Sequence, residues 1–374
     1  MNLSVISRRI ASLLFLIIIA DYQPATAQTN CPPPGTSYAF VISGRVTDSA
    51  GMPVSGVELY RDSTSATTPL AKTDANGNWE ATLTGCTLSP PRCGTGFNVR
   101  AYFIKPGLIF TPASVEVCPN SSANPIATSA PVTATSAASF QPSIASGSIS
   151  ALFAAPGTVF STNTEAASSL PLPESLAGTT VSISMSILGT RTPRNCKLYF
   201  VSPSRINLYL PPDLSPGPYE LTVQPASGTS VKSTLFLARV APALFTADST
   251  GRGTAAGVVL RVKPDGAQLY EPIVQFDVAR NNFAPVPIDL GAPGDQVFLI
   301  LFGTGFQFRS MNDTVRITIG GIDCQIPFAG EQGSLVGLGQ LNILLSPNLR
   351  GKGEVDAVLS VGAQSANTVT LTFK

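Results

Sequence analysis

INLYLPP at residues 206–212 sets an asparagine among apolar residues and ends on proline, and LNILLSP at residues 341–347 repeats the pattern. Asn and Pro stand five residues apart both times, as Asn207 to Pro212 and Asn342 to Pro347. Asparagine is disfavoured inside strands. Its repetition in an apolar strand therefore indicates a fixed hydrogen-bonding task, such as holding a neighbouring loop. A ligand contact is the alternative interpretation.

Outward from these stretches, three further segments recur in the same order, which indicates an internal duplication. They are GSISALF (147–153), TVSI (180–183) and CKLYF (196–200) in the first copy, and GDQVFLILF (294–302), TVRI (314–317) and CQIPF (324–328) in the second. Short apolar strands with a turn signal about every ten residues are typical of a β-sandwich. We expect one sandwich over residues 138–240, another over residues 291–374, and bridging strands at residues 241–290.

The composition also favours an all-β chain. The 374 residues include 32 Gly and 32 Pro, only 12% are charged and 44% are hydrophobic. This many turn residues suit many short strands, and the apolar share is sufficient for packed cores. The formal net charge of +1 gives no basic field for a nucleic acid, so no nucleic-acid partner is expected.

The sequence has no histidine, which removes the catalytic classes that depend on imidazole. Ser-His-Asp and Cys-His hydrolysis, His-ligated zinc and histidine acid–base chemistry are all excluded. A glycosidase built on two carboxylates is still possible. The acids considered for such a pair are Glu58, Glu80, Glu165, Glu174 and Asp289, and nothing in their spacing brings two of them together. We therefore predict no catalytic, cofactor-binding or metal-binding residues.

The N-terminus has the pattern of an export signal. Arg8 and Arg9 precede the apolar run IASLLFLIIIA at residues 10–20, and small residues follow at residues 25–27. The run is shorter than the ~20 residues that a membrane span needs. We expect cleavage after Ala27 and a secreted or cell-envelope protein with no membrane span in the mature chain. An uncleaved membrane anchor is the alternative.

Six cysteines in an exported chain indicate disulfides, and the absence of a CxxC pair argues against a zinc ribbon or a thioredoxin-type site. Cys86 and Cys93 bracket a Pro-rich loop, so a local bridge is expected there. Cys31 and Cys118 flank residues 28–118, and a bridge between them would join the two ends of a small domain. Other pairings of these four remain open.

Residues 28–118 are expected to form that small β domain. Asn76-Gly77 inside KTDANGNWEATL (72–83) is a hairpin signal, and the alternation after it places Trp79 in the core. Asp74, Asn76 and Asn78 also have the spacing of a calcium loop, but the Gly and Glu that such a loop requires are absent. Residues 119–137, rich in Pro, Ser, Thr and Ala, are predicted to be a linker.

Three motifs in this region carry a family resemblance: SGRVTDSAGMPVSGVELY (43–60), TDANGNW (73–79) and KPGLIFTPASVEV (105–117). They resemble a carboxypeptidase regulatory-like domain, which implies a transthyretin-like or collagen-adhesin B-type sandwich over residues 41–117. Such domains commonly serve as stalks, spacers or accessory modules. The resemblance implies a similar task here.

The C-terminal part resembles the C-terminal domain of secreted acidobacterial proteins, whose two halves are similar to immunoglobulin-like TIG sandwiches. The motifs are SAASFQPSIASGSISALF (136–153), SSLPLPESLAGTTVSI (168–183), YFVSPSRINLYLP (199–211) and GLGQLNILLSP (337–347). The resemblance implies that the bridging strands pack between the two sandwiches. Cys196 and Cys324 depart from the family pattern at equivalent places, which hints at a bridge between the halves. Two buried free thiols are the alternative.

The expected architecture is therefore all-β: a signal peptide, a small transthyretin-like sandwich, a linker and two tandem immunoglobulin-like sandwiches. We expect a non-enzymatic structural or interaction protein that acts as an extracellular spacer, display or adhesion module. Its partner would be an extracellular protein or a polysaccharide. A carbohydrate-binding module, free or accessory to an extracellular enzyme, is the alternative, and an exposed row of aromatic side chains would favour it.

Overall fold

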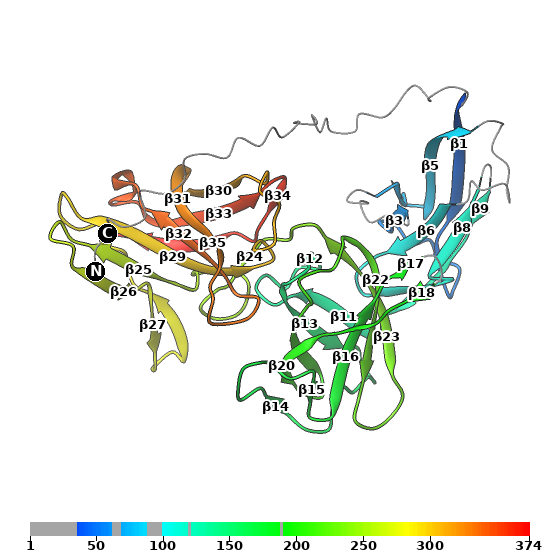
Figure 1. The fold of residues 1–374 in the computed structure, drawn as a ribbon, viewed down its shortest axis with the longest axis horizontal. Coiled ribbons are helices and arrows are strands. Elements are labelled where there is room, and N and C mark those ends of the chain that lie inside the picture. Colours follow the sequence, from blue (N-terminus) through cyan, green and yellow to red (C-terminus); the bar gives the residue numbers. More distant parts are fainter. Residues whose placement is uncertain (1–35, 62–68, 88–98, 119–120, 188–189) are drawn as a thin grey trace, which may run out of the picture.

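The computed structural model describes residues 36–61, 69–87, 99–118, 121–187 and 190–374. Their regular elements are β-strands and one short 3-10 helix, η1 (Pro347–Leu349), so the predicted all-β class is confirmed. Three β-sandwiches follow one another along the chain, from right to left in Figure 1. The expected signal peptide at residues 1–27 lies outside the described residues. Among those described, no helix is long and apolar enough to cross a membrane.

The first sandwich has three small sheets, in the orders β5-β1-β9, β2-β10-β7 and β4-β3-β6-β8. Trp79 is confirmed as a core residue: it is 3% exposed and its ring meets that of Phe103 edge to face at 5.9 Å. The strands are β1 (Thr36–Arg45), β2 (Thr47–Asp48), β3 (Glu58–Arg61), β4 (Ala71–Lys72), β5 (Asn78–Thr87), β6 (Val99–Ile104), β7 (Leu108–Thr111), β8 (Ser114–Val117), β9 (Ser122–Ala123) and β10 (Ile126–Ser129).

The Asn76-Gly77 turn differs from the expected hairpin. Gly77 does adopt a left-handed conformation with φ of 75°. The strands on its two sides, however, enter different sheets, because β4 pairs with β3 and β5 pairs with β1. The turn therefore carries the chain from one sheet to the other. The Asp74 carboxylate accepts the backbone N–H groups of Asn76 and Asn78, each at 2.8 Å, and so stabilises this turn.

The linker predicted at residues 119–137 is wrong for the described part of that stretch. β9 pairs with β1, and β10 pairs with β2 and β7, so both belong to the first sandwich. Ala123, Pro125 and Ala127 are buried at alternate positions, as in an ordinary strand. Small side chains fill a narrow space in the core here, and that is why a composition rich in Pro, Ser, Thr and Ala resembled a linker.

The second sandwich begins two residues after β10. Its main sheets have the orders β11-β13-β21-β20-β14 and β12-β23-β22-β16-β15, with β19 paired to β16. The strands are β11 (Val132–Ser136), β12 (Ile144–Ala145), β13 (Ile149–Ala154), β14 (Glu165–Ala166), β15 (Ser175–Leu176), β16 (Thr179–Ser184), β17 (Ser186–Ile187), β18 (Thr190–Arg191), β19 (Arg194–Asn195), β20 (Lys197–Val201), β21 (Arg205–Tyr209), β22 (Gly217–Gln224) and β23 (Val231–Ala238).

The third sandwich is one continuous series of pairings, β26-β25-β29-β32-β31-β30-β33-β34, with β24 on β29 and β35 on β33. The β27–β28 hairpin is a separate two-stranded sheet. The strands are β24 (Ala243–Leu244), β25 (Gly257–Val262), β26 (Gln268–Pro272), β27 (Val274–Asp277), β28 (Asn282–Pro285), β29 (Gln296–Thr304), β30 (Val315–Ile319), β31 (Ile322–Glu331), β32 (Gly339–Leu344), β33 (Gly353–Val361), β34 (Gln364–Ser365) and β35 (Val369–Phe373).

The bridging strands predicted at residues 241–290 do not form a separate layer between the sandwiches. β25 pairs with β29 over its whole length, and β24 pairs with the end of β29. Val259 of β25 is buried in the core of the third sandwich. This stretch therefore extends the third sandwich, because its apolar residues complete that core.

The two copies share their strand pairings. β13–β21, β21–β20, β16–β22 and β22–β23 in the second sandwich correspond to β29–β32, β32–β31, β30–β33 and β33–β35 in the third. Asn207 lies opposite Phe200, and Asn342 lies opposite Phe328. Both ladders also shift register just before that phenylalanine. The repeated segments therefore occupy equivalent places in two similar sandwiches.

Candidate functional site

The four early cysteines are only partly within the described structure. Cys118 is disulfide-bonded. Cys31 and Cys93 lie outside the described residues, and the side chain of Cys86 does too, although its backbone belongs to β5. The pairings expected for these cysteines therefore stay predictions.

The hinted bridge between Cys196 and Cys324 is wrong, because both are free thiols. Each lies where the chain crosses between the sheets of its own sandwich. Cys196 stands between β19, which pairs with β16, and β20, which pairs with β21. Cys324 is the last residue of β31 that pairs with β30, and Gln325 is the first that pairs with β32. A small apolar side chain fits such a corner.

Burial also makes these thiols weak acids. Desolvation raises the pKa of Cys196 to about 12, with a smaller effect from Glu174. Desolvation likewise raises the pKa of Cys324, which is only partly buried. Because the thiolate is the reactive form of cysteine, neither thiol is suited to nucleophilic chemistry.

The repeated asparagines have equivalent hydrogen bonds. Asn207 Oδ1 accepts from Arg205 Nε at 2.9 Å, and Asn342 Oδ1 accepts from Gln340 Nε2 at 2.7 Å. In each case the donor is two residues earlier on the same strand. The predicted structural task is thus present, but it stabilises the strand face rather than a neighbouring loop. The donor differs between the copies: it is charged in the second sandwich and neutral in the third.

The acids considered for a glycosidase pair have separate tasks. Glu58 accepts a hydrogen bond from the Tyr60 hydroxyl, Glu165 from the backbone of Ala177, and Glu174 from the Asn195 amide. Glu80 is an exposed residue of β5. These contacts do not bring any two of these acids together.

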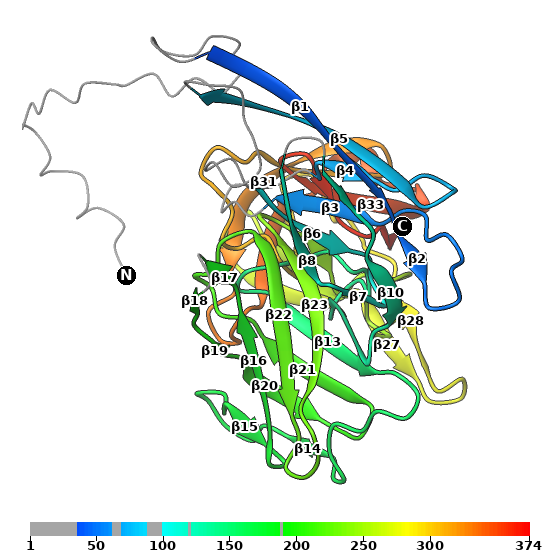
Figure 2. The ribbon, with the colours of Figure 1, turned by 90° about the vertical axis from the view of Figure 1, so that its right-hand side faces the viewer.

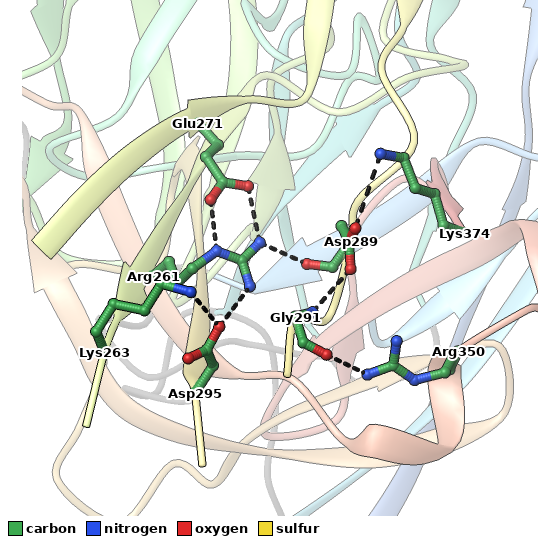
Figure 3. A network of polar contacts seen from close by, with 8 residues as sticks. All are labelled: Arg261, Lys263, Glu271, Asp289, Gly291, Asp295, Arg350 and Lys374. Atoms are coloured by element: carbon green, nitrogen blue, oxygen red, sulfur yellow. Dashed lines mark hydrogen bonds and ion pairs between the residues drawn. The ribbon is translucent and has the colours of Figure 1, made fainter. Parts of the chain in front are cut away.

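Asp289 borders a network that does gather acids (Figure 3). The Arg261 guanidinium, 6% exposed, binds Glu271 at 2.5 and 2.9 Å, the Asp289 carbonyl at 2.7 Å and Asp295 Oδ2 at 3.4 Å. Lys263 also binds Asp295 Oδ2, at 2.8 Å, and the Asp295 side chain is 3% exposed. Lys263, followed by Arg261, holds the pKa of Asp295 below its usual range. A carboxyl that stays ionised cannot serve as the general acid of a glycosidase. The contacts of this network instead connect β25, β26 and the loop before β29, and so stabilise that part of the third sandwich.

A metal centre has no support from side-chain grouping. Across the part of the chain that the structure describes, no three Cys, Asp or Glu side chains gather as metal ligands. At the calcium-like sequence, the Asp74 carboxylate bonds to the turn that it precedes.

The joint between the first and second sandwiches is short and packed. Ala130 and Pro131 are the only residues between β10 and β11. The Tyr60 ring stacks on Phe236 of β23 with centroids 3.9 Å apart and 25° between the planes. Figure 2 shows the first sandwich above the second, with β6 and β8 near β22 and β23. An aromatic stack beside a two-residue connection restricts rotation at this joint.

The joint between the second and third sandwiches has direct hydrogen bonds. The Ile149 backbone N–H donates to Thr304 Oγ1 at 2.9 Å, and that hydroxyl donates to the Gly337 carbonyl at 2.8 Å. The Tyr199 hydroxyl donates to the Val336 carbonyl at 2.5 Å. Gly337 and Val336 belong to the joint loop, which we define as residues 332–338 between β31 and β32.

Two glycines allow the surfaces of this joint to approach closely. Gly147 of the second sandwich has φ of 66° and lies against the Phe308 ring, and Gly337 has φ of 75° and lies against the Tyr209 ring. A Cβ atom at either position would overlap the facing ring. The contact therefore depends on residues without a side chain.

Beside these contacts, a groove of about 650 Å³ lies between the second and third sandwiches. Its walls are mainly apolar, and the residues that line it include no acid. The main ones are Tyr199, Arg205, Phe245, Phe302, Leu335 and Leu338. Apolar concave surfaces of this size are the usual places for small ligands.

A second apolar surface is the β27–β28 hairpin, which projects from the third sandwich in Figure 1. Phe276 and Phe283 face each other across its strands, with ring centroids 5.3 Å apart, and are 49% and 43% exposed. Val278 at its turn and Tyr270 on β26 are also exposed. We call the three residues of the hairpin itself, Phe276, Val278 and Phe283, the aromatic hairpin patch. Exposed apolar groups gathered in this way mark an interaction surface.

The sequence predictions had not included the groove, the joint loop or the aromatic hairpin patch. One signal was present: Arg205 and Gln340 occupy the same place in the repeated motif, so the change in charge is visible in the sequence. The glycines of the joint loop are a weaker signal. The exposure of Phe276 and Phe283 could not be inferred, because the alternation in IVQFDV (273–278) is also typical of a strand with one buried face.

Comparisons with known proteins give only remote structural likeness. No protein-family model and no curated protein matches the chain, so the two family resemblances stay predictions. Solved structures that are similar include titin tandem immunoglobulin domains (12% identity, 62% of this chain and 90% of that chain, TM-score 0.17). Murine CEACAM1b is 8% identical, with 65% of this chain and 100% of that chain covered and a TM-score of 0.16. The BcpA major pilin subunit of Bacillus cereus is 7% identical, with 83% of this chain and 97% of that chain covered and a TM-score of 0.16. At these TM-scores the likeness adds no argument beyond the strands themselves.

Proposed function

We propose that this protein is a non-enzymatic spacer or display arm of the cell exterior, built from three sandwiches in fixed order. The observation that carries the proposal is the packing at both joints. A two-residue connection and an aromatic stack restrain the first joint, and hydrogen bonds to Thr304 and the joint loop restrain the second. A flexible tether needs none of these contacts, whereas a spacer that presents a surface at a set distance does.

Export supports the same proposal. The signal-like N-terminus would bring the chain to an oxidising compartment, where disulfides of the first sandwich persist. N-terminal sequencing of the protein recovered from the culture medium and envelope fractions tests this. We expect a chain that starts at Gln28. A chain recovered only from the cytosol with Met1 retained would contradict the extracellular assignment.

Rigidity is tested by single-molecule fluorescence transfer between dyes on unnatural amino acids at Thr82 and Glu354, which are exposed in the first and third sandwiches. We expect one narrow distance distribution. Two joint variants serve as comparisons: Tyr60→Ala removes the aromatic stack, and Gly147→Val places a side chain against Phe308. Each should broaden the distribution. A distribution that is already broad in the unmodified protein would argue against a spacer.

A carbohydrate-binding module is the second candidate function, and the aromatic hairpin patch favours it. Exposed aromatic faces are what a sugar-stacking surface requires. The test is binding of the exported chain to insoluble polysaccharides and a glycan array, with the double variant Phe276→Ala/Phe283→Ala as comparison. Saturable binding that the double variant loses supports this function. Binding that the double variant retains places the sugar site elsewhere, and no binding to any glycan removes the candidate.

A further inference from the structure

We propose that the groove between the second and third sandwiches binds a small molecule with an apolar body and one carboxylate, which Arg205 pairs with. The inference goes beyond the spacer function, since a spacer needs no ligand. It rests on three features of the groove: its apolar walls, the position of Arg205, and the contrast between Arg205 and Gln340.

The internal repeat shows that the fold does not need a charge at position 205. In the third sandwich, Gln340 donates the equivalent hydrogen bond to Asn342, and a neutral amide is sufficient. In the second sandwich, Arg205 makes that bond with Nε alone. Its terminal Nη groups have no hydrogen-bond acceptor or acidic partner among the described residues. Apart from the two aromatic rings on which the guanidinium stacks, the positive charge therefore has no partner among the described residues.

Two aromatic rings hold this guanidinium in place. Arg205 Cζ lies 5.7 Å from the ring centre of Phe140 and 5.5 Å from that of Phe153, and the two rings are 6.2 Å apart. Stacking on aromatic faces restricts an arginine while leaving its outer donors available. Preorganised donors of this kind suit the recognition of a planar carboxylate.

Phe140 is also held in an unusual backbone conformation. Its φ is 56°, in the left-handed region that bulky residues rarely occupy. Such conformations are unfavourable and are often found at binding sites. Ser249, which lines the groove, has φ of 56° as well. One of these residues lines the groove and the other packs against Arg205, which lines it.

The walls define the rest of the ligand. Tyr199, Phe302 and Leu338 offer apolar surface from both sandwiches, and no acid among the lining residues competes for Arg205. The volume of about 650 Å³ lies within the range for small-molecule sites, roughly 300–1,000 Å³. An apolar body would fill the groove while a single carboxylate meets the guanidinium.

The test uses two probes with the same carbon skeleton, 4-phenylbutyrate, which ends in a carboxylate, and 4-phenylbutanol, which ends in a neutral hydroxyl. Each is titrated into the exported chain and followed by calorimetry and NMR. We expect 4-phenylbutyrate to bind more tightly. Arg205→Gln copies the residue of the other sandwich, so the fold should persist. It should weaken 4-phenylbutyrate roughly tenfold, as loss of a charge-assisted hydrogen bond implies, and change 4-phenylbutanol by less than about twofold.

Two further variants keep the result interpretable. Leu335→Asp puts a carboxylate on a half-exposed wall position and should weaken both probes. Arg61→Gln removes an exposed charge from β3 of the first sandwich and should change neither. The proposal is overturned if 4-phenylbutyrate fails to bind at millimolar concentration, or if Arg205→Gln and Leu335→Asp leave its affinity unchanged.

Discussion

The second and third sandwiches share one pattern of strand pairing but differ in what surrounds it. Both have a register shift before a phenylalanine, an asparagine opposite that phenylalanine and a free cysteine where the chain crosses between sheets. The third adds β25, the aromatic hairpin patch and the buried network around Arg261. The second adds Arg205 stacked on two rings. The features that both sandwiches share thus indicate what the fold requires. The features found in only one sandwich indicate a task that the fold itself does not require.

The largest expected effect tests whether the two cores are equivalent. Ile206→Ala and Leu341→Ala remove fully buried side chains at the same place in the repeat. Each should lower the free energy of unfolding of its own sandwich by about 2–5 kcal/mol, because a cavity is left behind. Hydrogen exchange read by mass spectrometry on peptides of each sandwich measures this. A cost confined to one of the two variants would show that the cores are not equivalent.

The next largest expected effect is a difference between the second and third sandwiches in the stability that each loses at low pH. Hydrogen bonds from Lys263 and then Arg261 lower the pKa of Asp295, so folding favours the ionised form. The resulting stabilisation is complete above the unfolded pKa of about 3.9 and is lost as the pH falls through the lower folded pKa. Lowering the pH from about 6 to about 3 should therefore weaken the third sandwich more than the second.

The second sandwich also has an acid with a lowered pKa, Asp213, and its contribution to acid sensitivity can be compared with that of Asp295. Arg194 causes that shift, but Asp213 is 59% exposed and solvent screens the pair. Asp295→Asn should reduce the difference between the sandwiches in urea unfolding at the two pH values, and Asp313, whose pKa Arg239 lowers, should maintain part of it. Equal acid sensitivity in the unmodified protein would contradict the importance of the Arg261 network.

Cys196 and Cys324 should lose different amounts of stability when each is replaced by serine. Cys196→Ser buries a hydroxyl without an identified partner and should cost about 1–3 kcal/mol, whereas Cys324→Ser, at a half-buried site, should cost less. Urea unfolding measures both, with the matching Cys→Ala variants as controls. A thiol reagent should modify Cys324 before Cys196 in the native protein, and the reverse order would contradict the assigned burial.

The repeated asparagines should respond equally. Asn207→Ala and Asn342→Ala each remove one acceptor on a strand face, and each should cost about 0.5–1.5 kcal/mol. Urea unfolding followed by hydrogen exchange in each sandwich gives the comparison. A loss several times larger at Asn207 alone would mean that this asparagine has a task its counterpart lacks.

The smallest expected effect comes from exchanging the two side chains that donate to the repeated asparagines, Arg205 and Gln340. Gln340→Arg should change the free energy of unfolding by less than about 0.5 kcal/mol, because either side chain can donate to Asn342. Arg205→Gln should lower it by about 0.5–1 kcal/mol, because the hydrogen bond to Asn207 can be kept but the stacking on Phe140 and Phe153 is lost. Thermal and urea unfolding of the two variants measure this. A large loss for Arg205→Gln would assign the charge to the fold and remove its availability for a ligand.

Much of the fold could be predicted from the sequence where side chains repeat or alternate. The duplication pointed to the equivalent strands, and the alternation after Gly77 placed Trp79 in the core. The alternation at Ala123 and Ala127 was equally regular but was carried by small residues, so composition concealed β9 and β10. The direction of the chain after Asn76-Gly77 depends on which sheet each strand joins, and local sequence does not determine that.

The candidate site was harder to predict because it consists of surfaces that meet only after folding. Tyr199 and Leu335 are 136 positions apart and line one groove. The hinted Cys196–Cys324 bridge failed for a related reason: equivalent positions in a repeat occupy equivalent corners of separate sandwiches, not one shared place. The contrast of Arg205 with Gln340 was readable from the repeat, but its meaning required the rings of Phe140 and Phe153.

The parallel pairing of β1 with β9, together with the two-residue connection that follows β10, has a mechanical consequence. Tension along the chain would pull the start of β1 and the end of β10 in opposite directions along their own axes. Hydrogen bonds between parallel strands loaded in this way must break together rather than one after another. The first sandwich would therefore transmit a pulling force to the second before it yields.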